Sequence, residues 1–333
     1  MRALVVAEPG RWSVEDVPDP EPGPGEILLA TRAVGICGSD LHILAGEFPP
    51  TPYPIIPGHE FAGVVAATGP GGGTLRPGDR VAVDPSLFCG SCRYCRAGRG
   101  NLCTNWGAIG DTVNGAFAEF VVVPERNAYV LPPSVTYSAG ALVEPMSCVV
   151  HGLQRLAVRA GSEVLIVGGG TIGIALLQAA RSAGAVRVDV VDSDPSRLAR
   201  AKALGAGVVD TSVAALLAAR GNGYEYVIEA TGVPAAARDA VTALDRGGTL
   251  LVFGVAPQDG RVEISPFQVY NDELTIMGTM AVLNSFAPAL GLVSAGAIDS
   301  DAMVTHTFPL DDFDAALDEM KSRQGLKVQI HFD

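Results

Sequence analysis

The sequence predicts an α/β protein of two domains, one an irregular β-barrel and the other a doubly wound parallel sheet. Residues 163–206 alternate buried-strand runs with helical spacing around a glycine-rich turn, which is typical of a parallel sheet. Residues before 150 instead contain short β-type runs separated by glycine and proline. At 333 residues the chain is also too long for one simple core, so two domains are expected.

The composition indicates a folded globular protein, because 48% of its residues are hydrophobic and only 18% are charged. Its net charge of −13 repels phosphate, which argues against nucleic acid and anionic membranes as partners. The first residues, "MRALVVAEPGRW", lack the pattern of a signal peptide. No run approaches the roughly 18 apolar residues of a membrane span. We therefore expect a soluble, cytoplasmic protein.

The β-type runs lie at residues 23–38, 61–69 and 78–85. Near the other end of the chain, a helix over 311–322 and a strand over 327–332 are expected to return to the same domain. The first domain is therefore predicted to comprise residues 1–148 and 286–333. The parallel-sheet domain is predicted to comprise residues 149–285.

Four of the six cysteines are crowded into one loop with the spacing C-x2-C-x2-C-x7-C. Disulfides are disfavoured, because cytosolic chains rarely keep them and such short loops would be strained. Four thiolates suit a tetrahedral Zn²⁺, with an iron–sulfur cluster as the alternative. A site with four protein ligands is closed to substrate, so this zinc is expected to be structural. Its predicted ligands are Cys89, Cys92, Cys95 and Cys103.

A second set of metal-binding residue types is scattered along the chain. Cys37 lies in "GICGSDLH", His59 and Glu60 lie in "PGHEFAGVV", and Glu144 lies in "ALVEPMSCVVHG". One thiolate, one imidazole and carboxylates match a catalytic zinc that keeps one position open. Each residue alone is weak evidence, since a lone cysteine is more often a small buried hydrophobe. Cys148, the sixth cysteine, is interpreted in that way.

The parallel-sheet domain carries a nucleotide-binding motif. An apolar strand over 164–167 runs into a G-x-G-x-x-G turn, a helical stretch follows, and a second strand over 186–191 ends in Asp192. These features at these spacings are the dinucleotide-binding fingerprint. The glycines let the backbone approach a pyrophosphate, and the helix N-terminus supplies amides to it. The predicted cofactor-binding residues of the turn are Gly168, Gly170, Thr171, Ile172 and Gly173.

Asp192 favours NAD over NADP, because a carboxylate accepts hydrogen bonds from ribose hydroxyls and repels a 2′-phosphate. Arg197 is also predicted to contact the cofactor, where it could meet a 2′-phosphate or cover the adenine. Further strands expected over 224–232, 247–255 and 274–280 continue the parallel sheet.

The chain resembles the zinc-containing medium-chain dehydrogenases over essentially its whole length. Glu60 directly after His59, the Glu144-Pro145 pair and residues 105–120 resemble the polyol dehydrogenases of the sorbitol and arabinitol type. The resemblance implies a GroES-like β-barrel domain, a Rossmann domain, NAD, two zinc ions per chain and a homo-oligomer, either dimer or tetramer. It rests on "GICGSDLH", "PGHEFAGVV", "PGDRVAV", the cysteine loop, "GAFAEFVVVP", "VEP" and "GGGTIG", in that order.

The resemblance also implies a reaction, the reversible oxidation of a secondary alcohol of a polyol or cyclitol to a ketone. Zinc held by Cys37, His59 and Glu60 would bind the substrate hydroxyl, and Glu144 would contact the zinc directly or through water. The electrons would pass as hydride to the nicotinamide.

Two further residues match a proton relay of this family. Ser39 and His42 follow the ligand Cys37 at the expected distances, and an imidazole with a near-neutral pKa suits that role. Asp40 is a candidate for the carboxylate that orients His59, with turn capping as the alternative role for an aspartate.

In one place the sequence departs from the sorbitol dehydrogenases, which carry an Arg-Tyr pair where this chain has Ala281 and Val282. Polar contacts to a long linear polyol are therefore expected to be missing. Amino-cyclitol, threonine and simple secondary-alcohol dehydrogenases are the alternative enzymes. A zinc-stabilised binding or structural protein is the alternative outside catalysis, which the dinucleotide fingerprint disfavours.

Overall fold

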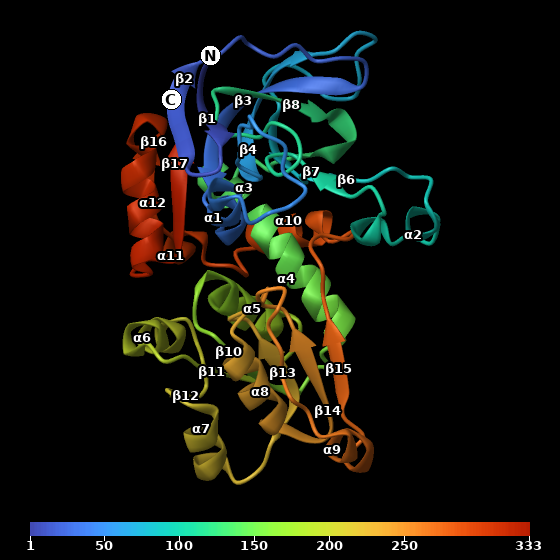
Figure 1. Ribbon diagram of the computed structural model, residues 1–333, viewed down its shortest axis with the longest axis vertical. Coiled ribbons are helices and arrows are strands. Elements are labelled where there is room, and N and C mark those ends of the chain that lie inside the picture. Colours follow the sequence, from blue (N-terminus) through green and yellow to red (C-terminus); the bar gives the residue numbers. More distant parts are fainter. The chain divides into compact units, whose positions relative to one another are not determined.

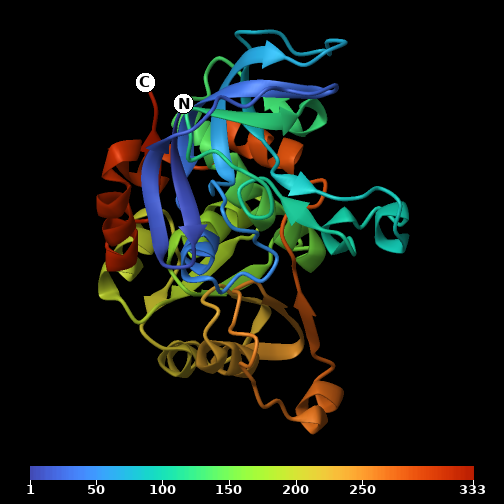
Figure 2. The ribbon, with the colours of Figure 1, turned by 45° about the horizontal axis from the view of Figure 1, so that its top comes forward.

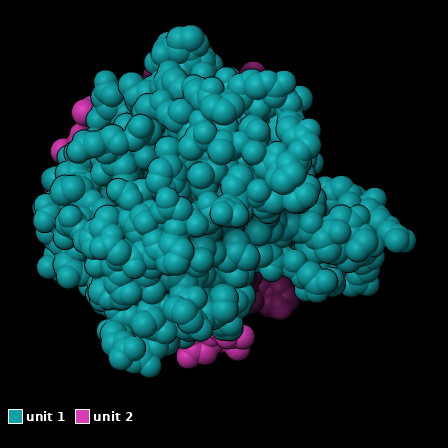
Figure 3. Space-filling model, turned by 90° about the horizontal axis from the view of Figure 1, so that it is seen from above, with its two compact units in different colours: residues 1–147, 282–333 teal, residues 148–281 magenta.

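The computed structural model describes residues 1–333 and divides the chain into two compact units, which Figure 3 colours separately. Unit 1 comprises residues 1–147 and 282–333, and unit 2 comprises residues 148–281. The first division falls within helix α4 (Val143–Leu156) and the second falls a few residues before helix α10 (Phe286–Ser294). The boundaries predicted from the sequence lie after residues 148 and 285.

Unit 1 is built on a seven-stranded sheet whose long central strand, β3, alternates buried and partly buried residues. This period of two is the sequence signature of a half-buried strand. β3 pairs antiparallel with β4, β8 and β17, so the last strand of the chain joins the first domain as predicted. The strands are β3 (Glu26–Gly35), β4 (Glu60–Thr68), β5 (Arg80–Val83), β8 (Phe120–Pro124), β9 (Ala128–Val130), β16 (Val304–Pro309) and β17 (Lys327–His331).

Shorter elements surround this sheet (Figure 1). Helix α12 lies beside the N-terminal strands in Figures 1 and 2, and the indole Nε1 of Trp12 donates a 2.9 Å hydrogen bond to Asp314. The further strands are β1 (Arg2–Glu8), β2 (Arg11–Asp16), β6 (Ser86–Leu87) and β7 (Gly107–Ala108). The helices, besides α4 and α10, are α1 (Gly38–Ala45), α2 (Arg93–Arg96), α3 (Tyr137–Ala141), α11 (Ser300–Met303) and α12 (Phe313–Ser322), with 3₁₀ turns at Gly100–Leu102, Glu125–Asn127 and Leu310–Asp312.

The core of unit 1 joins residues from both chain segments. Phe117 and Phe313 meet edge to face, with ring centroids 5.2 Å apart, and both are almost completely buried. Such aromatic pairs add to the free energy gained from burying apolar area. The C-terminal segment is therefore an integral part of the domain that carries Cys37 and His59.

Unit 2 is a six-stranded parallel sheet in the order β12-β11-β10-β13-β14-β15. The chain moves outward from β10 in one direction and then restarts on its other side at β13, which makes a doubly wound sheet. The strands are β10 (Glu163–Val167), β11 (Arg187–Val191), β12 (Val209–Asp210), β13 (Tyr224–Glu229), β14 (Leu244–Val252) and β15 (Thr275–Gly278). The helices are α5 (Thr171–Ser182), α6 (Pro195–Ala203), α7 (Val213–Arg220), α8 (Pro234–Thr242) and α9 (Pro266–Asn271).

None of the helices combines the length and hydropathy needed to cross a lipid bilayer.

Candidate functional site

Three of the scattered residue types converge in unit 1. Cys37 is the N-cap residue of α1, directly after β3, and His59 and Glu60 stand at the start of β4. Because β3 and β4 pair with Gly35 opposite Glu60, the two segments meet at this end of the ladder. Ligand atoms of Cys37, His59 and Glu60 all lie within 4.8 Å of one another, and His59 and Glu60 are buried. The three residues together could hold a metal ion.

Two buried carboxylates face the imidazole of His59. Its Nδ1 lies 3.2 Å from Oδ1 of Asp111 and 3.7 Å from Oδ1 of Asp40. The other oxygen of Asp40 accepts a 2.7 Å hydrogen bond from the backbone N–H of Cys37. Asp40 therefore has the capping role that was the alternative prediction, as well as the longer of the two contacts with His59.

Burial and nearby charges have opposite effects on the pKa values of the groups in this cluster. Burial raises the pKa of Asp40 to about 6, although the nearby His59 acts to lower it. For His59, burial alone would lower the pKa, but Asp111 and Asp40 outweigh burial and the pKa is raised. Asp111 was not predicted from the sequence. It lies in a turn-like segment, where an aspartate is ordinary and points to no ligand.

Glu60 has a buried partner that the sequence did not suggest. Nζ of Lys327, on β17, lies 2.8 Å from Oε1 and 2.6 Å from Oε2 of Glu60, and it also donates a 3.2 Å hydrogen bond to the carbonyl of Ile36. Burial alone would lower the pKa of Lys327, but Glu60, Cys37 and Glu144 together outweigh burial and the pKa is raised. The negative charge of Glu60 in the cluster is thus compensated by the positive charge of Lys327.

Glu144 does not belong to the group of ligand atoms that lie within 4.8 Å of one another. It is nevertheless close enough for His59 to affect its pKa electrostatically. It stands in the first turn of α4 and is 9% exposed. Burial raises the pKa of Glu144 to about 8. The structure therefore brings three of the four predicted ligands of this site together and keeps the fourth nearby.

The two predicted relay residues lie on the same helix, α1. Ser39 Oγ is 3.9 Å from the Sγ atom of Cys37, which makes it a neighbour of the cluster. His42 is near the other end of α1, with its side chain 56% exposed and its Nδ1 2.8 Å from Glu47. One relay candidate is therefore beside the possible metal ligands and the other is open to solvent.

The four crowded cysteines form a second cluster that could hold a metal. All four Sγ atoms lie within 4.8 Å of one another, and none of the thiols is in a disulfide. Backbone N–H groups of Cys95 and Thr104 lower the pKa of Cys92 to about 5. Hydrogen bonds from Ser91 lower the pKa of Cys89 to about 7. Thiolates at these positions are what a zinc ion requires.

Arginines alternate with these cysteines, and all three are exposed. Arg93 stacks on the ring of Tyr94 with 4.6 Å between its guanidinium carbon and the ring centroid. Arg96 and Arg99 are exposed to solvent as well.

The glycine turn of unit 2 connects β10 with α5 at the carboxyl end of the sheet. Gly168 has φ = 112°, a conformation that L side chains rarely adopt. A Cβ atom on Gly173 would overlap the carbonyl oxygen of Gly168, whereas Gly170 has open space around it. The turn lies between β11 and β13, where the order of the sheet reverses, which is the usual ligand-binding place in such sheets.

Asp192 follows β11 and is bound to the turn. Its Oδ2 accepts a 2.7 Å hydrogen bond from the N–H of Gly169, and its Oδ1 accepts one of 2.8 Å from the N–H of Asp194. Arg197, on α6, places Nη1 3.5 Å from Oδ2 of Asp192. The acid, the arginine and the glycine turn therefore lie together, and their contact with a cofactor stays a prediction.

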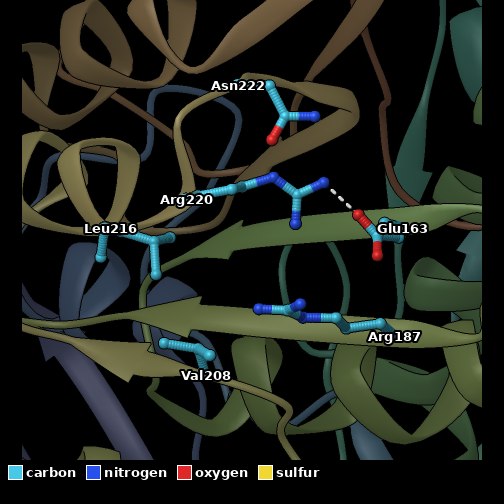
Figure 4. A pocket seen from close by; sticks show the side chains of 7 residues that line it. Glu163, Arg187, Val208, Leu216, Arg220 and Asn222 are labelled. Atoms are coloured by element: carbon cyan, nitrogen blue, oxygen red, sulfur yellow. Dashed lines mark hydrogen bonds and ion pairs between the residues drawn. The ribbon is translucent and has the colours of Figure 1, made fainter.

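A separate cavity of about 460 Å³ lies at the opposite, amino ends of β10 and β11 (Figure 4). Glu163 and Arg187, the first residues of these strands, line it, and Arg220 from α7 pairs with Glu163. Nε of Arg187 donates a 2.9 Å hydrogen bond to Asp189. These contacts compensate the buried Asp189 and the partly exposed Glu163, and the cavity is remote from the glycine turn.

Comparisons with known proteins find a separate family for each of the two domains. The family described as "Alcohol dehydrogenase GroES-like domain" matches residues 23–133, and the family described as "Zinc-binding dehydrogenase" matches residues 171–295. Both matches confirm the predicted fold class, a GroES-like domain followed by a Rossmann domain.

Three similar proteins cover nearly the whole chain. D-arabinitol dehydrogenase 1 of Uromyces fabae is 36% identical over 99% of this chain and 97% of its own length. L-threonine 3-dehydrogenase of Mesorhizobium japonicum is 35% identical over 98% of both chains. A solved structure of a candidate zinc-binding dehydrogenase from Sinorhizobium meliloti 1021, bound to NADP, has a TM-score of 0.93 at 35% identity and covers 99% of both chains.

Proposed function

The chain belongs to the zinc-binding alcohol dehydrogenases with a GroES-like domain, and on that premise we propose that it is a zinc-dependent polyol oxidoreductase. It reversibly oxidises a secondary alcohol of a polyol or cyclitol to a ketone with NAD. The observation that carries the proposal is the convergence of Cys37, His59 and Glu60 in a chain that also has a dinucleotide turn. One thiolate, one imidazole and one carboxylate form a donor set that fits a catalytic zinc.

The residues around this donor set have assigned roles in the proposal. When bound, zinc would lower the pKa of the substrate hydroxyl and stabilise negative charge on its oxygen. Asp111 keeps the Nδ1 of His59 as a donor, which leaves Nε2 as the ligand atom, and Asp40 adds a longer electrostatic contact. Ser39, beside Cys37, would take the proton of the substrate hydroxyl while passing its own proton on through the relay to His42, which releases a proton to solvent with its ring held by Glu47.

Glu144 acts through a water molecule in this proposal. Its carboxylate is buried, but it does not lie within 4.8 Å of all three donor atoms. A direct bond would need Glu144 or its helix to move. A bridging water satisfies the same acceptor without that movement.

The second zinc is structural and is held by the four cysteines. The four sulfur atoms lie within 4.8 Å of one another and would fill all the positions of a four-coordinate zinc, which would leave none for a substrate. The observation that supports this role is that the four residues belong to one loop, residues 89–103, whose short helix α2 contains no buried residue. A loop with so little apolar core depends on the metal for its conformation.

NAD is the proposed cofactor. The Asp192 carboxylate carries negative charge at the place where an adenosine ribose would lie, and a 2′-phosphate there would meet a like charge. Arg197 offers the opposing charge, but it lies 3.5 Å from Asp192 and is partly compensated by it. Because the Sinorhizobium meliloti relative binds NADP, the choice of cofactor is a sharp test of this assignment.

The proposed substrates are vicinal diols, shorter polyols and cyclitols. The arabinitol dehydrogenase relative supports a polyol, and Glu60 and Glu144 provide acceptors that suit a second hydroxyl group. Val282 is 4% exposed and apolar, so it offers no polar contact to the far end of a longer chain. A threonine-type amino alcohol is the second candidate, favoured by the Mesorhizobium japonicum relative.

A homo-oligomer, dimer or tetramer, is also proposed. Strand β15 ends the six-stranded sheet and has no strand of this chain on its outer side. Three of its four residues are exposed, among them Ile276 at 38%. Unpaired edge strands readily pair with another chain. The function as a whole is tested by following NADH formation with a panel of polyols, cyclitols, amino alcohols and simple secondary alcohols.

A further inference from the structure

Lys327 is a fully buried base to which the reaction proposed above assigns no part. Its side chain is 6% exposed, and that of Glu60 is 2% exposed. Removing two charges from water costs several kcal/mol per ion, and their attraction often does no more than offset it. The lysine is therefore poorly explained as a contribution to stability, and its position suggests another role.

The position of Lys327 follows from strand pairing. β17 runs antiparallel to β3, with Gln329 opposite Gly35, and the N–H of Ile36 donates to the carbonyl of Val328. Lys327 thus reaches the end of β3 where Cys37 follows. Its Nζ contacts Glu60 and the carbonyl of Ile36, the residue directly before Cys37. The ammonium group of Lys327 therefore connects the backbone next to Cys37 with the side chain of Glu60.

Gly35 leaves the room that this contact needs. It stands opposite Glu60 in the ladder, and a Cβ atom added to Gly35 would overlap Oε2 of Glu60. Any larger residue would force the Glu60 carboxylate out of this position. Here the need for glycine is steric, since Gly35 is an ordinary extended residue of β3.

We propose that Lys327 is a positioning residue that, with the space left by Gly35, holds the Glu60 carboxylate beside Cys37 and His59 ready for the metal. The inference rests on the zinc site of the proposed function. Lys327 does not touch the substrate or the reacting atoms. It acts through Glu60, because its ammonium group restricts the orientation of the Glu60 carboxylate. The same ammonium group also binds the carbonyl of Ile36, the residue directly before Cys37.

The first test compares zinc affinity in chelator titrations of the zinc-loaded protein. Lys327→Met keeps the length of the side chain and removes its charge. It is expected to lower the affinity of the catalytic zinc roughly 10- to 100-fold, the usual effect of removing a partner of a metal ligand. Lys321→Met removes an exposed lysine of α12 and is expected to change nothing. Unchanged or tighter zinc binding by Lys327→Met overturns the inference.

A double-mutant cycle separates positioning from a general structural role. In Glu60→Gln, the side chain no longer carries the charge that Lys327 holds, so adding Lys327→Met is expected to change zinc affinity less than about twofold. A further tenfold loss in the double variant means that Lys327 acts elsewhere, and it contradicts the inference. The double variant also buries no unpaired charge, so it gives a result even where Lys327→Met alone does not fold.

Gly35→Ala gives independent evidence, because it leaves every charge in place and removes only the space. It is expected to lower catalytic zinc affinity about as much as Lys327→Met, whereas unchanged affinity contradicts the role of Gly35. Cys37→Ala distinguishes a failure of the proposed metal site from a failure of the positioning role of Lys327. If Cys37→Ala retains both zinc ions, the proposed metal site itself is wrong. If it loses one while Lys327→Met binds zinc normally, only the positioning role is overturned.

Discussion

Nδ1 of His59 lies 3.2 Å from Oδ1 of Asp111, closer than to Asp40, although Asp111 is 52 positions away along the chain and Asp40 only 19. Both carboxylates are buried, so neither contact is weakened by solvent. Asp40 also accepts a hydrogen bond from the backbone N–H of Cys37, and its contact with His59 is the longer of the two. Asp111 is thus the carboxylate best placed to fix the tautomer and orientation of His59.

Replacing Asp111 is expected to weaken the catalytic zinc. Asp111→Ala removes the acceptor for Nδ1 of His59 and is expected to lower zinc affinity and kcat/KM roughly 10- to 100-fold. Asp111→Asn keeps an oxygen at the same place and is expected to lose less. Zinc affinity from chelator competition and initial rates measure both effects. Equal, wild-type behaviour of the two variants would remove Asp111 from the site.

The two proposed zinc sites are expected to respond differently to mutation. Cys37→Ala is expected to abolish turnover and leave a folded protein with about one zinc ion per chain, because an open site serves chemistry more than folding. Cys92→Ala is expected to lower the melting temperature, because a structural zinc contributes to folding free energy. Metal analysis and thermal melts check both variants. Full activity in Cys37→Ala contradicts the catalytic assignment.

The preference for NAD is expected to depend on Asp192. A carboxylate beside a 2′-phosphate costs several kcal/mol, which is on the order of 100-fold in kcat/KM. Asp192→Ala is expected to narrow the gap between NAD and NADP, because Arg197 then meets the phosphate without competition from the acid. The measurement is kcat/KM for both cofactors in the two proteins. A wild-type preference for NADP would show that Arg197 dominates.

The edge of the parallel sheet is expected to matter for assembly. Ile276→Lys places a charge on β15 and is expected to shift the protein toward monomer in size-exclusion chromatography with light scattering. Val186→Lys is the matched control, since Val186 is also exposed in unit 2, at 72%, but lies outside β15. A wild-type protein that is monomeric, or an Ile276→Lys variant with unchanged mass, argues against assembly through this edge.

Local motifs made much of the molecule predictable. The glycine turn with Asp192 and the cysteine loop are each encoded within a few tens of residues. The glycines are needed for a backbone conformation that binds a pyrophosphate, and the cysteine spacing is typical of a zinc site. Cys37, His59 and Glu60 were predictable as residue types, and the pairing of β3 with β4 then brings them together. The return of the C-terminal strand to the first domain was also predictable from pattern.

Lys327 and Asp111 were not predictable in the same way. Lys327 begins a strand that the sequence predicted only to return to the first domain, and its contact with Glu60 spans 267 positions of the sequence. Such a contact depends on the register of β17 against β3, and register is set by packing of the whole sheet rather than by a local motif. Asp111 in turn has the sequence environment of any turn aspartate.

In the proposed function, the substrate is a secondary alcohol that carries a neighbouring hydroxyl group, and it is oxidised by NAD at the proposed zinc site. A kcat/KM comparison of vicinal diols, cyclitols, sorbitol, threonine and 2-propanol, with NAD, tests it most directly. Vicinal diols or cyclitols are expected to exceed sorbitol, and to exceed 2-propanol by at least ~100-fold, because 2-propanol has no second hydroxyl group to donate to the carboxylates of the site. If 2-propanol is the best substrate, the polyol assignment is contradicted.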